Sequence, residues 1–255
     1  MVKAKDIFRL MKKDRVSICR VSDLLEGGID PGWLENEFVR LNREVWGDIA
    51  DSRYLWSHDM IESHFKMCPE FIYCGFERGN LVATLTNMRT TEEDMRKKKT
   101  WLERTDNGFL TTHRPEGDIG FGVDLSVSRR ASKRVSDRIV LAALCVSLVG
   151  EGLQAVYLGA RIPGYHKHQD MSVEEYVYGK RNSGKPLDPE LYFYLKNGFE
   201  IVEVIPHYIA DPASLNYGVL IRWSNPLYSL TKALPFLKPM IRFIGKSLHR
   251  ERLSH

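Results

Sequence analysis

Several side chains suited to acid–base chemistry lie in or just after apolar segments of the sequence. Asp118 and Asp124 lie in DIGFGVDLSV, and His166 and His168 follow the segment AVYLGARI. A carboxylate can accept a proton, and imidazole has its ordinary pKa near neutrality, so these residues are candidates for a general base. His166 also follows the carboxyl end of a predicted strand, where active sites of α/β proteins collect. Each of these residues could equally have a structural role.

Two further residues near His166 are candidates for binding a substrate. Arg161 ends the segment AVYLGARI, and Tyr165 lies in the loop that follows it. A guanidinium group forms planar, bidentate contacts with carboxylates, so Arg161 could hold an acidic group of a substrate. A salt bridge at the end of a strand explains Arg161 equally well.

The elements that must position these residues alternate between strands and helices. The predicted strands are residues 15–21, 71–77, 81–88, 118–127, 155–162, 201–209 and 217–223. The predicted helices are residues 33–47, a segment that begins after Ser57, residues 131–152 and residues 189–197. This order predicts an α/β fold with one mixed sheet and helices on both faces.

Local signals support three of these elements. Arg78-Gly79-Asn80 separates two apolar runs and indicates a β-hairpin. Asp188 and Pro189 are the residue types that favour the start of a helix, and Gly198 is typical of its end. The helix over residues 189–197 is therefore defined at both ends.

Segments that break the pattern define the domain organisation. Residues 91–117 and 163–187 are polar and are predicted to be insertions in a domain that covers residues 1–223, the first of them on its surface. Residues 224–255 form an extension in which apolar side chains alternate with six lysines and arginines and one glutamate. Such a segment could lie at a membrane surface or pack on the domain as a helix. Its prolines favour the packed extension.

Composition excludes several classes of protein. No apolar run approaches the ~20 residues that span a bilayer, and the first residues lack a secretory pattern, so we expect a cytoplasmic protein. The four cysteines form no CxxC pair and no histidine cluster completes a zinc pattern, so we expect no metal. The net charge of +4 is concentrated in the extension, and we expect no nucleic-acid partner.

The element order over about residues 15–223 resembles the GNAT superfamily of N-acyltransferases. Two segments carry the more specific resemblance. One is DIGFGVDLSVSRRASKRVSDRIVLAAL, and the other contains Tyr194, Gly198 and Phe199 in the family pattern YxxxGF. Within the superfamily, ARIPGYHKH is similar to GNAT domains that are fused to nitrilase-type hydrolases, although no such hydrolase is recognised in this chain.

The resemblance implies an acyl-thioester donor, acetyl-CoA or another acyl-CoA. It places the pantetheine arm along a strand edge formed by Leu125, Ser126 and Val127. It places the pyrophosphate on the loop before the next helix, where backbone N–H groups and positive side chains can bind an anion. The implied donor-binding residues there are Arg130, Lys133, Arg134, Val135, Ser136 and Asp137.

This loop departs from the family pattern because SRRASKRVSD contains no glycine. Glycine allows a backbone to approach a phosphate closely, so its absence affects how the donor binds. The basic side chains could compensate for it. Alternatives are an acyl carrier protein as the donor, or a basic loop that binds no ligand.

The resemblance also implies catalytic roles. Tyr194 matches the tyrosine that protonates the departing thiolate, and His166 or Asp124 would take the proton of the amine. The expected reaction is direct transfer of an acyl group to a small-molecule or protein amine, and the resemblance implies an acetyl group. Two other functions remain open: a GNAT-like protein without catalysis that binds a ligand or partner, and a membrane-peripheral enzyme that uses long-chain donors.

Overall fold

A seven-stranded sheet organises the computed structural model, which describes residues 16–49, 51–132, 135–145 and 150–237. The strand order is β1-β2-β3-β4-β5-β7-β6, and only the β4–β5 pair is parallel. The strands are β1 Ser17–Arg20, β2 Ile72–Glu77, β3 Asn80–Thr90, β4 Ile119–Val127, β5 Ala155–Ala160, β6 Glu200–Ile205 and β7 Gly218–Ser224. This sheet confirms the predicted mixed α/β fold, and each predicted strand corresponds to an observed one.

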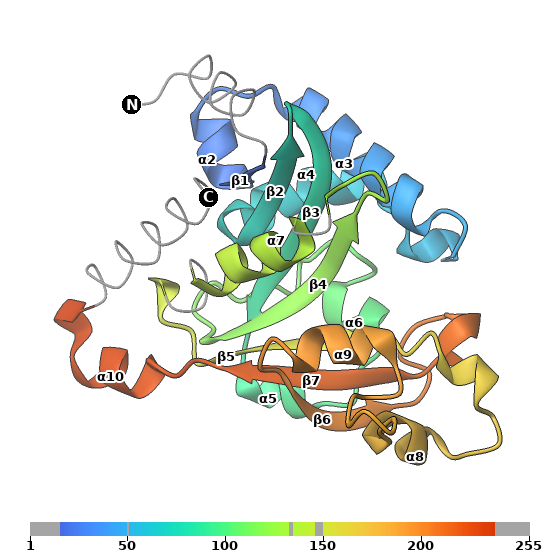
Figure 1. Cartoon of the computed structure of the whole chain (residues 1–255). Helices are drawn as coiled ribbons and strands as arrows, with labels where there is room; N and C mark the ends of the chain where they lie inside the picture. The colour runs from blue at the N-terminus through green and yellow to red at the C-terminus, as the bar shows by residue number, and fades with distance from the viewer. Residues whose placement is uncertain (1–15, 50, 133–134, 146–149, 238–255) are drawn as a thin grey trace.

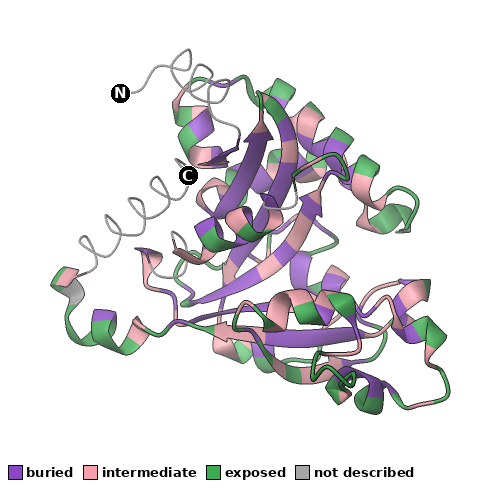
Figure 2. Cartoon of the chain, in the orientation of Figure 1, coloured by how far each residue is buried: buried purple, intermediate pink, exposed green. Residues whose placement is uncertain are grey.

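Helices cover both faces of the sheet (Figure 1). Helices α3 and α4 lie behind β2–β4, whereas α7 and α9 lie in front of the sheet. Most residues of the central strands are consequently buried (Figure 2). The α-helices are α2 Val21–Glu26, α3 Pro31–Trp46, α4 His58–Met67, α5 Glu92–Arg96, α6 Trp101–Thr105, α7 Val135–Ala143, α8 Val173–Tyr178, α9 Pro189–Leu195 and α10 Tyr228–Ala233.

The predicted helix ends and hairpin are confirmed by their local geometry. The Asp188 carboxylate accepts hydrogen bonds from the backbone N–H groups of Glu190 and Leu191 at the start of α9. Gly198 follows this helix with φ of +87°, a conformation that favours glycine. Arg78 and Gly79 both have positive φ, which matches the twist of a two-residue hairpin between β2 and β3.

The prediction that residues 91–117 lie on the surface holds for only part of the segment. This segment contains α5 and α6, and Met95, Trp101 and Leu110 are each at least 94% buried. Residues 163–187 likewise contain α8, with Tyr176 and Val177 in the core. The two segments are polar on average, but their few apolar side chains pack inward, and composition alone does not reveal that.

The parallel strands β4 and β5 separate after a short contact. They pair from Ile119 with Ala155 to Gly122 with Leu158, while β4 continues to Val127. Beyond Gly122 the two strands run in clearly different directions (Figure 1). Beyond Gly122, the edge of β4 that faces β5 therefore has no strand partner. The space beside this edge is next to Asp124.

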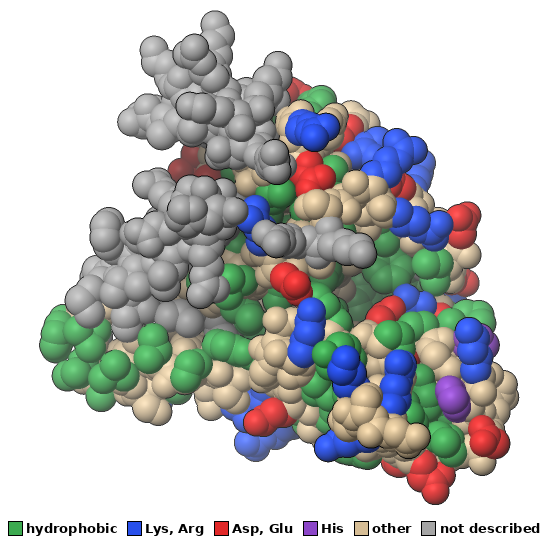
Figure 3. Space-filling view, in the orientation of Figure 1, with side chains coloured by type: hydrophobic (Ala, Val, Ile, Leu, Met, Phe, Trp, Pro, Cys, Tyr) green, Lys and Arg blue, Asp and Glu red, His purple; other side chains and the backbone are tan. Residues whose placement is uncertain are grey.

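The described beginning of the C-terminal extension packs on the domain. The Asn225 side chain donates to the carbonyl oxygen of Leu153, and Thr231 in α10 is buried. Leu230, Leu234 and Phe236 are exposed, and Figure 3 shows hydrophobic side chains gathered at the surface near α10. Residues 238–255 lie outside the described part of the chain. Within that part, none of the helices has the length and apolarity that a bilayer crossing requires.

Candidate active site

A cavity of about 470 Å³ lies where β4 and β5 separate. Its walls come from β4, β5, α7, α9, the end of α3 and the loop after β6. Hydrophobic side chains form most of this lining, and they gather in a recess beside β4 (Figure 3). A volume of this size accommodates a small organic ligand. The charged side chains among the described lining residues are Asp124, Arg161, Glu190 and Asp211.

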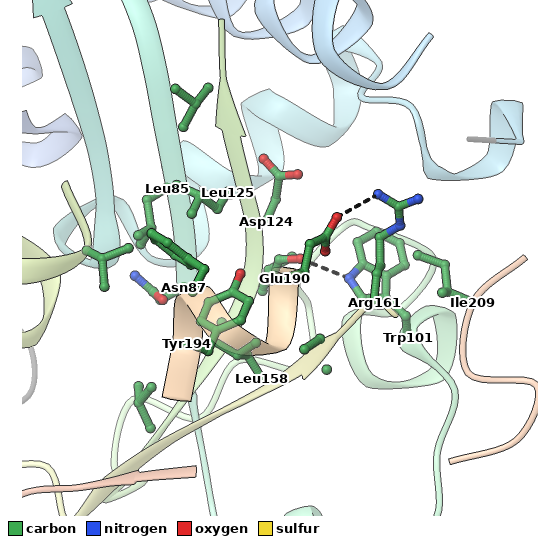
Figure 4. A pocket seen from close by; sticks show the side chains of 18 of the residues that line it. Leu85, Asn87, Trp101, Asp124, Leu125, Leu158, Arg161, Glu190, Tyr194 and Ile209 are labelled. Carbon is green, nitrogen blue, oxygen red and sulfur yellow. Dashed lines mark hydrogen bonds and ion pairs between the residues drawn. The ribbon is translucent and has the colours of Figure 1, made fainter. Parts of the chain in front are cut away.

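Asp124 faces this cavity next to an irregularity of β4. The β3–β4 register shifts between Asn87, which pairs with Gly122, and Thr86, which pairs with Asp124. Val123 is therefore the extra residue of a β-bulge, and its carbonyl oxygen accepts a hydrogen bond of 3.0 Å from Trp101 Nε1. Bulges re-aim the side chains that follow them. Here the Asp124 carboxyl points into the cavity (Figure 4).

The environment of Asp124 favours a carboxyl group that exchanges its proton near neutral pH. Burial raises its pKa to about 6, because the charged form loses water. The Ser126 hydroxyl donates to Asp124 Oδ2 at 2.8 Å, and Trp46 Nε1 donates in turn to Ser126 Oγ at 2.8 Å. These groups and the Trp56 indole lower the pKa and partly offset the effect of burial. The Asp124 carboxyl is therefore held in place by a hydrogen bond and lines the cavity with a pKa close to neutral pH.

Two residues of α9, Glu190 and Tyr194, point toward the same cavity (Figure 4). They are four positions apart, which places them on one face of a helix. Asp188 and Pro189 fix the start of α9 and thereby the orientation of this face. Sequence reasoning missed Glu190, although its spacing from Tyr194 was a signal that could have identified it.

Glu190 belongs to a network of charges with Arg161 and Asp211. Arg161 Nη1 lies 3.3 Å from Glu190 Oε1, and Arg161 Nε lies 2.9 Å from Asp211 Oδ2. Burial raises the pKa of Glu190 to about 7, against the lowering effect of Arg161. Burial also acts to raise the pKa of Asp211, but its hydrogen bonds, chiefly to Arg161, hold that pKa below the usual value. Arg161 is thus already engaged by two carboxyl groups.

The Tyr194 ring is held by its neighbours while its hydroxyl stays available. The ring packs edge-on against Phe193 and Phe199, with centroids 5.1 Å and 5.5 Å away. The hydroxyl points into the cavity and makes no hydrogen bond to any described residue (Figure 4). Burial, helped by the nearby Glu190 and Asp124 carboxyls, raises the pKa of Tyr194. The phenol therefore keeps its proton at neutral pH and can donate it.

Aromatic side chains form the wall of the cavity near Asp124. Trp46 ends α3, Trp56 precedes α4, and Trp101 comes from the segment predicted as a surface insertion. The Trp101 ring lies 5.7 Å from Trp56 and 5.5 Å from Tyr54, centroid to centroid. Nothing in the sequence spacing of these residues indicated that they meet.

The predicted donor-binding residues of β4 and α7 differ in whether they line the cavity. Leu125 and Val127 line the cavity, as does Ser136 at the start of α7. Ser126 does not line it but positions Asp124. Val135 is fully buried in the core, and Asp137 forms an ion pair with Lys196.

In the described part of the predicted phosphate-binding loop, side chains of the protein already accept hydrogen bonds from backbone N–H groups. The Glu77 carboxylate accepts from the Ser132 backbone N–H, with its two oxygens at 3.1 and 3.3 Å. Ser128 Oγ accepts from the Arg130 N–H at 3.2 Å and donates to Glu44 Oε1. The Arg130 residue is exposed. Lys133 and Arg134 lie outside the described residues.

His166 and Tyr165 do not reach the cavity, so the structure gives their predicted roles no support. His166 is exposed, and its Nδ1 lies 2.7 Å from the carbonyl oxygen of Pro163. Tyr165 is buried and donates its hydroxyl to the Met171 carbonyl oxygen. The loop after β5 turns away from the separation between the strands, which proximity in sequence could not show. Among the described residues, no cluster of potential ligands is arranged to hold a metal ion.

Two bacterial proteins resemble this chain in sequence. The uncharacterized N-acetyltransferase YkwB of Bacillus subtilis is 32% identical over 191 residues, which cover 74% of this chain and 84% of YkwB. The probable hydrolase YhcX of the same organism is 28% identical over 176 residues, or 68% of this chain. That match spans 34% of the length of YhcX. No protein-family model matches the chain.

Two solved structures share the fold. The loading GNATL domain of CurA from Lyngbya majuscula superposes with a TM-score of 0.66 and 17% identity, over 82% of this chain and 97% of that domain. The GphF GNAT-like decarboxylase, in complex with isobutyryl-CoA, gives a TM-score of 0.61 and 20% identity, over 82% of this chain and 98% of its own. At these identities the likeness concerns the fold alone.

Proposed function

Because this chain belongs to the GNAT superfamily of N-acyltransferases, we propose that it transfers an acyl group from acyl-CoA to an amine by direct attack. The main support is that Asp124, Glu190 and Tyr194 face one cavity at the point where β4 and β5 separate. Two carboxyl groups with pKa values near neutrality and one protonated phenol are the acid–base groups that such a transfer needs.

The carboxyl groups take the proton of the amine. Asp124, with a pKa of about 6, is largely ionised at neutral pH and is the proposed base. Glu190, with a pKa of about 7, is the second candidate on the opposite wall. As the amine nitrogen attacks the thioester carbonyl carbon, its proton passes to the base, directly or through a water molecule.

β4 and Tyr194 act on the negative charges that form on the carbonyl oxygen and on the departing sulfur. A backbone N–H of the unpaired β4 edge near Leu125 stabilises the oxyanion that forms on the carbonyl oxygen. When the carbon–sulfur bond breaks, the Tyr194 hydroxyl protonates the departing thiolate. The phenol recovers its proton from solvent or from the protonated base, which completes the cycle.

The site suits the pantetheine arm of the donor better than its diphosphate. The unpaired edge of β4 can bond an extended pantetheine arm as it would a strand. At the loop, however, a diphosphate must replace the Glu77 carboxylate at the Ser132 N–H. Glu77 therefore competes with acyl-CoA for the backbone N–H of Ser132. This competition also supports an acyl carrier protein as the alternative donor, since its binding does not depend on a diphosphate there.

Coenzyme A should raise the melting temperature of the protein by mass action. Glu77→Gln should tighten coenzyme A binding by ~5-fold, because removing one nearby like charge contributes about 1 kcal/mol. Thermal shift and calorimetry measure both effects. Glu62→Gln is the matched control, since Glu62 is an exposed residue of α4 that pairs with Lys66.

Unchanged melting with acetyl-CoA, octanoyl-CoA and an acyl carrier protein would favour the alternative of a GNAT-like protein without catalysis. A shift with the carrier protein alone would replace the proposed donor. Equal coenzyme A affinity of the Glu77 variant and the wild type would remove Glu77 from the donor site.

The turnover rate should rise with pH between about 6 and 7, because the base works only after it has lost its proton. If Asp124 is the base, Glu190→Gln keeps this rise and Asp124→Asn loses it. Single-turnover rates over this range give the profile of the chemical step. The reverse pattern in the two variants would assign the base to Glu190, and a flat wild-type profile would exclude both.

A further inference from the structure

The charges of the cavity restrict which amine can enter. The described lining carries three carboxyl groups and one guanidinium, so the cavity is acidic once these groups are ionised. An acidic, largely apolar cavity attracts a cation and repels an anion. The carboxyl group of Asp124 forms no ion pair with any described residue, so it can face an ammonium group directly.

The one guanidinium of this lining does not reverse this preference. Arg161 is bonded to Asp211 and paired with Glu190, and its side chain is only 14% exposed. Its Cζ also lies 5.3 Å from the Trp46 ring centroid. Because Asp211 and Glu190 already offset the charge of Arg161, an acceptor carboxylate bound there would add a negative charge without a cation of its own, which is costly in a buried site.

The wall around Asp124 favours an apolar body on the acceptor. Trp46 is linked to Asp124 through Ser126, and Trp56 is close enough to influence the Asp124 pKa. Trp101 and Tyr54 continue the same aromatic wall. Aromatic faces bind both apolar groups and cations, the second through the electrons of the ring.

We infer that the acceptor is a primary amine on an apolar body of about the size of an aromatic ring, bound as its ammonium ion and carrying no carboxylate. This inference rests on the proposed function, because it takes the cavity to be the acceptor site. It extends that function by excluding free amino acids as good substrates. Asp124 attracts the ammonium group and takes one proton from it, which then passes to solvent. Ionised again, Asp124 takes the second proton as the neutral nitrogen attacks the thioester carbon.

Three related compounds test the inference. 2-Phenylethylamine has the ring and the amine, phenylalanine has the same groups plus a carboxylate, and 3-phenylpropionate has the ring and the carboxylate only. Calorimetry on the full chain should show 2-phenylethylamine binding at least ~100-fold more tightly than phenylalanine, with no binding of 3-phenylpropionate. The values of kcat/KM with acetyl-CoA should follow the same order. They are measured from the coenzyme A that is released when the acetyl group passes to the amine nitrogen.

A single variant should change this selectivity in a defined direction. Glu190→Gln removes one negative charge and frees Arg161 Nη1, so the preference for 2-phenylethylamine over phenylalanine should fall by ~10-fold. Glu174→Gln is the control, because Glu174 is exposed on α8 and does not line the cavity. Binding is the main measurement, since Glu190 also remains a candidate base.

The outcomes separate the inference from the function on which it rests. Phenylalanine or 3-phenylpropionate binding as tightly as 2-phenylethylamine would overturn the inference, and so would no binding of the amine. Tight and selective binding of 2-phenylethylamine without transfer from any acyl donor would uphold the inference about the cavity and refute the proposed acyl transfer.

Discussion

Tyr194→Phe should lower the turnover rate by ~100-fold or more, the usual scale for losing a general acid. The substitution removes only the hydroxyl, which bonds to none of the described residues, and keeps the ring contacts, so the fold should keep its stability. Donor affinity should change little, because the lost hydrogen bond forms mainly as the thiolate develops. Steady-state and single-turnover kinetics with acetyl-CoA measure these effects.

Tyr192→Phe provides the internal control for this experiment. Tyr192 lies on the same helix but is 37% exposed and has Lys185 Nζ 5.2 Å from its ring centroid, outside the cavity. It should retain normal turnover. Near-normal turnover of Tyr194→Phe, with chemistry shown to limit the rate, would refute the role of Tyr194. Slow product release must be excluded first, because it could hide a real loss.

Asp124→Asn should reduce kcat/KM by ~1,000-fold, within the range for removing a general base together with its attraction for the ammonium group. Asparagine keeps the shape of the side chain and can still accept a hydrogen bond from Ser126. The comparison variant is Asp118→Asn, whose carboxyl accepts from the Tyr228 hydroxyl outside the cavity. Comparable activity of Asp124→Asn and Asp118→Asn would contradict the assignment of the base.

The same Asp124 variant should be more stable than the wild type at neutral pH. Because the Asp124 pKa is raised from 3.8 to about 6 in the folded protein, the folded state binds this proton more tightly than the unfolded state. The carboxyl therefore lowers the free energy of unfolding as the pH rises through this interval, and above it the loss is complete. Asparagine avoids this loss, and the gain approaches ~3 kcal/mol at most.

Denaturant unfolding at pH ~4.5 and ~7.5 measures this difference. The variant should exceed the wild type by more at the higher pH. An equal or opposite difference would mean that Asp124 is paired in the folded state and not held as a buried, proton-exchanging group. Higher stability with lower activity is the combination expected of a catalytic residue whose environment opposes its charge.

The sequence by itself determined the order of the elements. Alternating apolar residues predicted the strands, and local residue types set the helix ends, as at Asp188 and Gly198. These signals are local because a helix start or a hairpin depends on a few neighbouring residues. The resemblance to the GNAT superfamily directed attention to Tyr194 and to the edge of β4, and the structure places both beside the cavity.

The tertiary structure alone decided which residues accompany Tyr194. His166 is near β5 in sequence but turns away, whereas Trp101 reaches β4 from a segment that composition marked as surface. Glu190, Arg161 and Asp211 meet although they come from three separate elements. The reason is physical: a site between two separating strands collects side chains that are far apart in sequence, and the separation itself depends on how β4 and β5 pack. Gly120 of β4 shows how closely the two strands pack before they separate, because a Cβ there would lie 2.4 Å from Val156 Cγ2 of β5.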